Sequence, residues 1–308
     1  MKVIVTGGAG FLGSHLVDAL IARGDEVVVI DNLFRGLREN VNSEAIFIEG
    51  DVCDYSVLTA AVEELDGVDL IHHLAAINGT KWFHEAADKV ISVNINATHR
   101  VIELALEYEA RLIIASSPEA YGEQSAMPLS SESVAVFPPA HIHQRHSYGA
   151  SKYLDEVALQ HAVRSKGLDG RIIRPFNAYG PRLRGDEYGQ VIAMMLAKAK
   201  SGHAIEVHGD GKQTRSFTWV HDVIEGMLKV SDQDGLAGKS FNLGRDEEIS
   251  ILALAERIAS LCSAQIVMKG SYHGDSIRRL PDLTDNDIIA WCAETSLDEG
   301  LAILSGEL

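Results

Sequence analysis

Cysteine is scarce in this sequence, and the features of secreted and membrane proteins are missing from it. The three cysteines are widely spaced, without a CxxC pair or a histidine at metal-ligand spacing, so we expect reduced thiols. No apolar run reaches the length of a membrane-spanning helix, and a strand pattern at residues 2–5 stands where a signal peptide would have its basic and apolar regions. These absences predict a cytoplasmic protein that has no membrane partner.

Positive charge is also in short supply. The 27 lysines and arginines are outnumbered by 44 aspartates and glutamates, which gives a net charge of −17. This balance argues against binding to nucleic acid or to anionic membranes. An anionic ligand would need a local pocket of arginines and helix N-termini. The 13 histidines form no HExxH motif and have no matched carboxylate pattern, so no metal site is predicted.

The first half of the chain alternates between short apolar strands and helical patterns. The expected strands are 3–5, 26–30, 45–49, 68–72, 111–115 and 172–174, and the longest expected helices are 89–109 and 148–166. Continuous apolar strands that alternate with helices indicate a parallel sheet covered on both faces. The predicted fold class is therefore α/β, and ligands should bind beyond the carboxyl ends of the strands.

The bend between the first strand and the first helix is rich in glycine. Gly7, Gly10 and Gly13 have GxxGxxG spacing, which permits a tight turn and lets the backbone approach a pyrophosphate at a helix N-terminus. A plain flexible turn is the alternative. Asp31 ends the second strand, where a carboxylate can bind a ribose diol and would repel the 2′-phosphate of NADP. The pattern therefore favours a Rossmann-type site for NAD.

Two further strand ends should border the same cofactor. Asp51 and Val52 follow the third strand and are expected near the adenine, although Asp51 could instead be a simple strand-end cap. Leu74, Ala75 and Ala76 follow the fourth strand and would place small side chains against the cofactor.

The candidate catalytic groups lie at the fifth strand and on the helix that follows it. Tyr148 and Lys152 are four residues apart, so they share one helical face, and an ammonium beside a phenol lowers the pKa of the phenol. A phenolate could take the proton of a sugar hydroxyl while hydride leaves the same carbon. Ser117 ends the fifth strand and could hold the substrate oxygen. Taken alone, a half-buried tyrosine over a surface lysine and a capping serine are the alternatives.

These motifs together resemble the extended short-chain dehydrogenase/reductases, a family of nucleotide-sugar epimerases, dehydratases and decarboxylases. The matching segments are TGGAGFLG at 6–13, DN at 31–32, GDV at 50–52, HHLAA at 72–76, VNINAT at 93–98, SSPEAYG at 116–122, SYGASK at 147–152, RPFNAYGPR at 174–182, GDGKQTRSFTWVHD at 209–222, FNLG at 241–244 and IRRLPD at 277–282. They extend along nearly the whole chain.

The resemblance implies roles for particular residues. Ser117, Tyr148 and Lys152 would form the catalytic triad, and the cofactor site would include Phe11, Leu12 and Asn32 as well as the residues above. In the substrate site, Asn177 would touch the nucleotide diphosphate, Arg215 would contact the nucleotide ribose or phosphate, and Arg279 would be a second anion ligand. Surface or interdomain salt bridges are the alternative for the two arginines. Lys81 follows the fourth strand and could border the sugar.

The resemblance also implies how the chain is organised. An NAD-binding Rossmann domain would cover residues 1–175, with a returning segment at about 214–240. A smaller C-terminal α/β lobe, made of 176–213 and 241–308, would bind the nucleotide-sugar. Two such chains would form a homodimer through the helices expected at 89–109 and 148–166.

The reaction is narrowed by the residues that follow Ser117. Relatives share oxidation of the sugar at carbon 4. Pro118 and Glu119 stand where 4,6-dehydratases have an Asp-Glu pair, so dehydration is disfavoured. Glu119 and the IRRLPD segment resemble UDP-glucuronate decarboxylases, but Pro118 replaces their usual serine. We expect a UDP-sugar 4-epimerase, with a decarboxylase as the alternative. A non-catalytic NAD-binding regulator is less favoured, because the tyrosine and lysine are both present.

Overall fold

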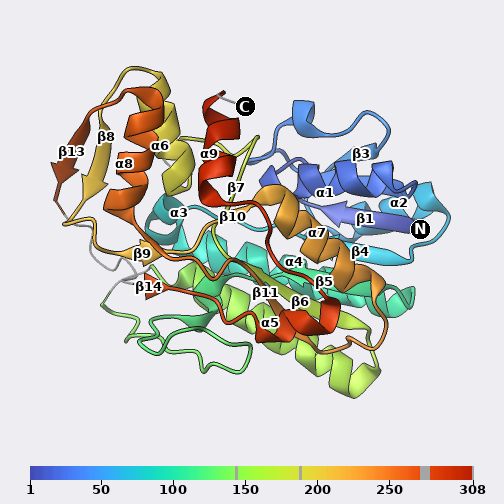
Figure 1. The fold of residues 1–308 in the computed structure, drawn as a ribbon. Helices are drawn as coiled ribbons and strands as arrows, with labels where there is room; N and C mark the ends of the chain where they lie inside the picture. Colours follow the sequence, from blue (N-terminus) through green and yellow to red (C-terminus); the bar gives the residue numbers. More distant parts are fainter. Residues whose placement is uncertain (143–144, 187–188, 271–277, 307–308) are drawn as a thin grey trace.

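A seven-stranded parallel sheet forms the centre of the molecule (Figure 1). The computed structural model describes residues 1–142, 145–186, 189–270 and 278–306. The strands, in the order in which they lie across the sheet, are β11 (Ser240–Leu243), β6 (Gly170–Pro175), β5 (Arg111–Ala115), β4 (Leu70–His73), β1 (Lys2–Thr6), β2 (Glu26–Asp31) and β3 (Ile46–Glu49). This arrangement confirms the predicted Rossmann-type α/β fold, because the strand order reverses direction at β1.

Helices cover both faces of the sheet. One face carries α1 (Phe11–Ala22) and α7 (Val220–Asp232), and the other carries α2 (Tyr55–Leu65), α4 (Ala87–Glu107) and α5 (Ser147–Lys166). Residues of β1 alternate between the two layers: Val3 and Val5 pack with the first set, and Ile4 with the second. All three are fully buried. The continuous apolar strands of the sequence therefore reflect a sheet that is buried on both sides.

The seventh strand lies later in the chain than the sequence suggested. We expected the chain to return to the Rossmann domain over about 214–240. In the structure β11 extends the sheet to Leu243 and pairs in parallel with β6, with Phe241 opposite Ile173. Phe241 and Ile173 are both fully buried. The segment Ser240–Leu243 alternates polar and apolar residues and lacks the continuous apolar run that indicated the predicted strands, so its pairing with β6 is what reveals it.

The C-terminal lobe, which Figure 1 shows at the side of the sheet away from β3, has a separate core. Its helices and strands are α6 (Val191–Lys200), β8 (Ile205–His208), α8 (Ile251–Cys262), β13 (Ile266–Lys269) and α9 (Leu297–Ser305). Three short strands, β9 (Thr214–Arg215), β12 (Ile249–Ser250) and β14 (Arg278–Arg279), form a small sheet. Ile205, Val207 and Leu254 are fully buried in this core. Strand β8 pairs in parallel with β13.

The remaining elements connect the lobe to the sheet. They are α3 (Thr80–Glu85), the paired strands β7 (Ala178–Tyr179) and β10 (Thr218–Trp219), and three 3-10 helices: η1 (Arg38–Asn40), η2 (Pro118–Tyr121) and η3 (Thr284–Ile289). Contacts between α1 and the chain after β7 also join the two parts. His15 hydrogen-bonds to the Pro181 carbonyl at 3.0 Å, and Arg182 forms an ion pair with Asp18 at 2.7 Å. Within the described ranges, no helix is both long and apolar enough to cross a bilayer.

The paired helices α4 and α5 expose apolar side chains. Ile91 on α4 and Tyr153, Leu154 and Val157 on α5 are each at least 40% exposed. An apolar strip on a pair of packed helices is typical of an association surface. It supports the predicted homodimer, which stays a prediction.

Packing on β1 should dominate the stability of the sheet. Ile4 is fully buried, whereas Ile46 on the edge strand β3 is 41% exposed. We expect Ile4→Ala to lower the free energy of unfolding by about 2–5 kcal/mol, since it leaves a cavity. Ile46→Ala should cost much less. Chemical denaturation of both variants measures this, and equal losses would contradict the assignment of the core.

Candidate functional site

The glycine-rich bend after β1 lies against the loop after β4. Gly7 has a φ of +71°, and a Cβ at this position would come within 2.7 Å of the Ala75 amide nitrogen. A Cβ at Gly13 would overlap the carbonyl of Gly7. Helix α1 begins at Phe11 after Gly10, and no side chain caps it. Its first amides, including those of Phe11 and Leu12, are therefore available for a pyrophosphate, and the closely packed backbone fits a dinucleotide.

Asp31 places a buried carboxylate at the end of β2. It is 8% exposed and accepts hydrogen bonds from the amides of Ala9 at 3.0 Å and Leu33 at 2.8 Å. Burial raises the pKa of this carboxyl, while the two amides oppose the rise. Arg35 follows nearby but forms an ion pair with Asp186 at 3.3 Å. The arrangement fits a ribose diol. The Asp31 carboxylate would still repel the 2′-phosphate of NADP, as the sequence predicted.

Other predicted cofactor residues make local contacts. Asp51 accepts a hydrogen bond from the Cys53 amide at 2.9 Å, which matches the capping alternative, and Val52 is buried. Asn32 accepts one from the Phe34 amide at 3.1 Å. The segment Leu74 to Ala76 is partly buried beside the glycine-rich bend. Contact of these residues with the cofactor stays a prediction.

Tyr148 lies in the first turn of α5, in a mostly apolar position. Its side chain is 6% exposed and its ring stacks on Phe83 of α3, with a centroid separation of 4.9 Å and an angle of 8°. The neighbouring Ser147 hydroxyl donates to the Phe83 carbonyl at 3.1 Å, which ties the two helices together. Ser117 lies close enough to the phenol to act on its pKa, which it lowers. The fold thus brings together the serine and the tyrosine that we expected to act on one substrate oxygen.

The electrostatic surroundings of Tyr148 differ from our expectation. Burial raises the pKa of the phenol, the charges of Glu119 and Asp155 raise it further, and Ser117 opposes them. We expected the Lys152 ammonium to lower this pKa. In the structure the ammonium lies 3.3 Å from the carboxylate of Asp155, which the sequence analysis missed.

Glu119 is held next to the start of α5 by a close backbone approach. A Cβ at Gly149 would overlap the Glu119 carbonyl, so glycine is required there. Arg279 is 3% exposed and donates to the Pro118 carbonyl at 3.0 Å and to the Glu119 carboxylate at 3.3 Å. The guanidinium of Arg145 lies 3.9 Å from the other carboxylate oxygen. Two arginines from distant parts of the chain thus converge on one carboxylate.

The charge of Glu119 is stabilised by these arginines. Burial alone would raise the pKa of its carboxyl, but Arg279, Arg145 and Arg215 together lower it below its ordinary value. The sequence analysis predicted Arg215 and Arg279 as anion ligands and missed Arg145. The one available signal was the position of Arg145, three residues before Tyr148. Ile277, at the start of the IRRLPD segment, lies outside the described residues.

Of the predicted substrate residues, Arg215 and Arg279 belong to this cluster, whereas Asn177 and Lys81 make local contacts elsewhere. Strand β14 pairs with β9 so that Arg279 is opposite Arg215. Asn177 has a φ of +39°, and its side chain donates to the Ser216 carbonyl at 2.8 Å. Lys81 is on α3, the helix whose Phe83 stacks on Tyr148. The fold brings the two arginines side by side, while contact of each residue with a substrate stays a prediction.

A buried polar network supports the serine end of the site. Arg174 forms a bidentate pair with Glu156, at 2.8 and 2.6 Å, and donates to the Tyr121 hydroxyl at 2.8 Å. Ser116 donates to the same Glu156. The Tyr121 hydroxyl donates in turn to Asn242 on β11 at 2.8 Å. The sequence analysis missed this network, although Arg174 and Asn242 lie within matched segments.

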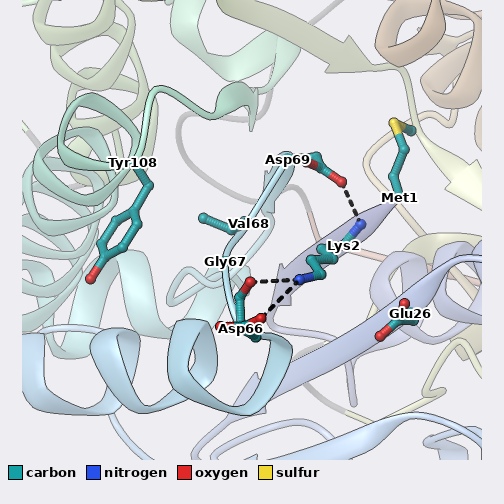
Figure 2. A pocket seen from close by; sticks show the side chains of 8 residues that line it. All are labelled: Met1, Lys2, Glu26, Asp66, Gly67, Val68, Asp69 and Tyr108. Atoms are coloured by element: carbon teal, nitrogen blue, oxygen red, sulfur yellow. Dashed lines mark hydrogen bonds and ion pairs between the residues drawn. The ribbon is translucent and has the colours of Figure 1, made fainter.

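A shallow hollow occurs at the opposite edge of the sheet. Figure 2 shows Lys2 between Asp66 and Asp69, with Tyr108 to one side. The Lys2 amide donates to Asp69 at 2.8 Å, and its ammonium donates to the Asp66 carbonyl at 2.5 Å. This hollow lies at the amino ends of the strands, so it is not the ligand edge of a parallel sheet.

Comparison with known proteins places this geometry in a family. The model of the NAD dependent epimerase/dehydratase family matches residues 3–244. The chain is 36% identical to UDP-glucuronic acid decarboxylase 1 of Arabidopsis thaliana, with 98% of this chain and 68% of that protein covered. It is 33% identical to the UDP-N-acetyl-alpha-D-glucosaminuronate decarboxylase of Bacillus cytotoxicus, with 97% of this chain and 95% of that protein covered.

Solved structures match the fold along its full length. A UDP-glucose 4-epimerase of Thermotoga maritima with UDP-glucose has a TM-score of 0.92 and 28% identity, with 99% of this chain and 98% of that one covered. The UDP-glucose 4-epimerase of Thermus thermophilus in complex with NAD has a TM-score of 0.90 and 26% identity, with the same coverage. The relatives thus include both decarboxylases and epimerases.

The glycine-rich bend should control cofactor affinity. Gly13→Ala would place a methyl group against the Gly7 carbonyl and distort the backbone of the glycine-rich bend. We expect NAD to bind at least about tenfold more weakly, a cost of about 1.4 kcal/mol. Titration calorimetry measures the affinity. Gly270→Ala is the matched control, because a Cβ there meets nothing within 4 Å; equal effects of the two variants would contradict this cradle.

Proposed function

Because the chain belongs to the NAD dependent epimerase/dehydratase family, we propose that it is an NAD-dependent UDP-sugar 4-epimerase. Members of the family are enzymes that use NAD, and the glycine-rich bend and Asp31 fit that cofactor. UDP-sugars are named in the matched 4-epimerase and decarboxylase relatives. Bound NAD would accept a hydride from carbon 4 of the sugar and later return it. The chain's own residues supply the remaining steps.

The observation that carries the proposal is the balance of charge around Glu119. Arg145, Arg215 and Arg279 provide three positive charges near this one carboxylate. The excess of two offsets the two negative charges that a sugar diphosphate carries when both its phosphates are esterified. A sugar with its own carboxylate would add a third negative charge that the cluster does not offset. The balance therefore favours a UDP-sugar with an uncharged ring.

Tyr148 and Ser117 would handle the proton of the 4-hydroxyl. The Ser117 side chain lies close enough to the Tyr148 phenol to lower its pKa, so one sugar oxygen could contact both. Tyr148 takes the proton as the carbon is oxidised and gives it back when the ketone is reduced. Epimerisation requires only that the 4-keto sugar presents its other face before reduction, so no further acid is needed.

Decarboxylation of a UDP-glucuronate-like substrate is the second candidate function. The pair between Glu119 and Arg279, at 3.3 Å, lies beside Tyr148, and the resemblance ties both residues to decarboxylases. The two curated relatives described above are also decarboxylases by name. A 4-ketone next to a 6-carboxylate makes loss of carbon dioxide easy, and the same tyrosine would serve the first step.

Products from a panel of nucleotide-sugars separate the two candidates. We expect the purified protein with NAD to change the stereochemistry of a UDP-hexose at carbon 4 while the mass stays the same. Mass spectrometry and NMR of the product measure both. Loss of carbon dioxide from UDP-glucuronate, with no change to UDP-hexoses, would instead support the decarboxylase. Inactivity on the whole panel would contradict both candidates.

Tyr148 should be essential for turnover and dispensable for cofactor binding. Tyr148→Phe removes the proton-accepting oxygen and keeps the ring that stacks on Phe83, so we expect kcat to fall by about 10²–10⁴-fold. NAD affinity, measured by titration calorimetry, should stay near that of the wild type. Tyr108→Phe, at the opposite edge of the sheet, is the control. Full activity of Tyr148→Phe would show that another group is the base.

A further inference from the structure

Asp155 forms an unusually buried ion pair with the lysine of the proposed catalytic site. The ammonium of Lys152 donates to its carboxylate at 3.3 Å, and the two side chains are 3% and 2% exposed. Both residues are on α5, three positions apart. A buried charge is costly unless it is paired, so each of these two groups requires the other.

Polar groups of the neighbouring helix and of the sheet lie beside the pair. The Thr98 hydroxyl, on α4, acts to lower the pKa of the Asp155 carboxyl, and Oδ1 of Asp155 has no hydrogen-bond partner among the described residues. Thr98 lies 3.2 Å from Nε2 of His73, whose Nδ1 lies 2.8 Å from the Thr6 hydroxyl. Thr6 accepts a hydrogen bond from the Ala75 amide at 3.3 Å. These bonds connect Thr98 to the loop that packs on the glycine-rich bend.

His73 contributes no charge beside the pair. It is fully buried, and burial lowers its pKa to about 3, so it stays neutral. Burial raises the pKa of the Asp155 carboxyl, and the Lys152 ammonium and the Thr98 hydroxyl oppose that rise. The negative charge of Asp155 therefore depends mainly on its pair with Lys152.

The geometry points to Asp155 as a positioning residue that holds the Lys152 ammonium and offsets its charge, so that Tyr148 keeps its proton until NAD is bound. This inference rests on the proposed function, because it takes Tyr148 to be the base. An ammonium that is paired with a carboxylate attracts less negative charge onto a neighbouring phenol. The positive nicotinamide ring of NAD would restore that attraction only in the loaded enzyme.

Other charged groups around the pair do not replace this role. On α5, Glu156 is paired with Arg174 at 2.6 Å. On η2, Glu119 is surrounded by arginines. The residues that approach from α4 and β4, Thr98 and His73, are uncharged.

The effect on Tyr148 has a definite sign. The negative charge of Asp155 raises the pKa of the Tyr148 phenol, after the larger effect of burial. Removal of that charge should lower the pKa of the phenol, so the base is available at lower pH. A side chain with a purely structural role would change stability and leave this ionisation where it is.

The test is an ultraviolet titration of tyrosinate in Asp155→Asn, with and without NAD. The signal of Tyr148 is isolated by subtracting the same protein with Tyr148→Phe. We expect the midpoint to fall by about one pH unit in Asp155→Asn relative to the wild type, and NAD to lower the wild-type midpoint. The acid limb of the kcat profile should move in the same direction. Glu103→Gln, which removes one charge from the exposed side of α4, should leave the midpoint unchanged.

Asp155→Ser repeats the measurement with a smaller side chain if the asparagine variant does not fold. An unchanged midpoint and an unchanged acid limb in a folded variant would overturn the inference and leave Asp155 a structural residue. A shifted midpoint in a protein that converts none of the UDP-sugars would support the inference on Asp155 and contradict the proposed function. The failure of one can therefore be distinguished from the failure of the other.

Discussion

The close backbone approach of Gly149 to the Glu119 carbonyl determines the geometry of the whole candidate site. It presses the first turn of α5 onto η2, so Tyr148 meets Ser117 and lies beside Glu119. A side chain at Gly149 would force the two elements apart. Arg174, on β6, links the same two elements, because it pairs with Glu156 on α5 and donates to the Tyr121 hydroxyl on η2. The catalytic arrangement thus follows from a packing constraint rather than from flexible side chains that find one another.

Electrostatics within this frame are opposite to those of the protein as a whole. The chain has a net charge of −17, yet three arginines act on the one carboxylate of Glu119. The Lys152 ammonium, one helical turn after Tyr148, is instead offset by Asp155. Positive charge is therefore in excess around Glu119, where we propose that the diphosphate binds, and is balanced at Lys152.

Much of the architecture could be read from local sequence patterns. Apolar strands of four to six residues, broken by helical periods, predict a buried parallel sheet, because the constraint acts within each segment. Two further patterns are equally local. One is the spacing of Gly7, Gly10 and Gly13, and the other is the spacing of Tyr148 and Lys152; each spans at most two helical turns. These patterns can be recognised in the sequence because each one depends only on residues that are close together along the chain. The strand β11 was missed, because Ser240–Leu243 alternates polar and apolar residues and does not form the continuous apolar run that indicated the other strands.

The sequence by itself therefore determined the fold class, and it predicted the glycine-rich bend as the cofactor site and Tyr148, Lys152 and Ser117 as the catalytic residues. Tertiary structure alone decided how the charges are paired. Arg279 meets Glu119 across 160 residues of chain, and Arg145 joins them from the loop before α5. Lys152 is paired with Asp155 rather than left to Tyr148. The physical reason is that the strength of an ion pair depends on distance and on exclusion of water, and neither is written in the spacing of residues along the chain.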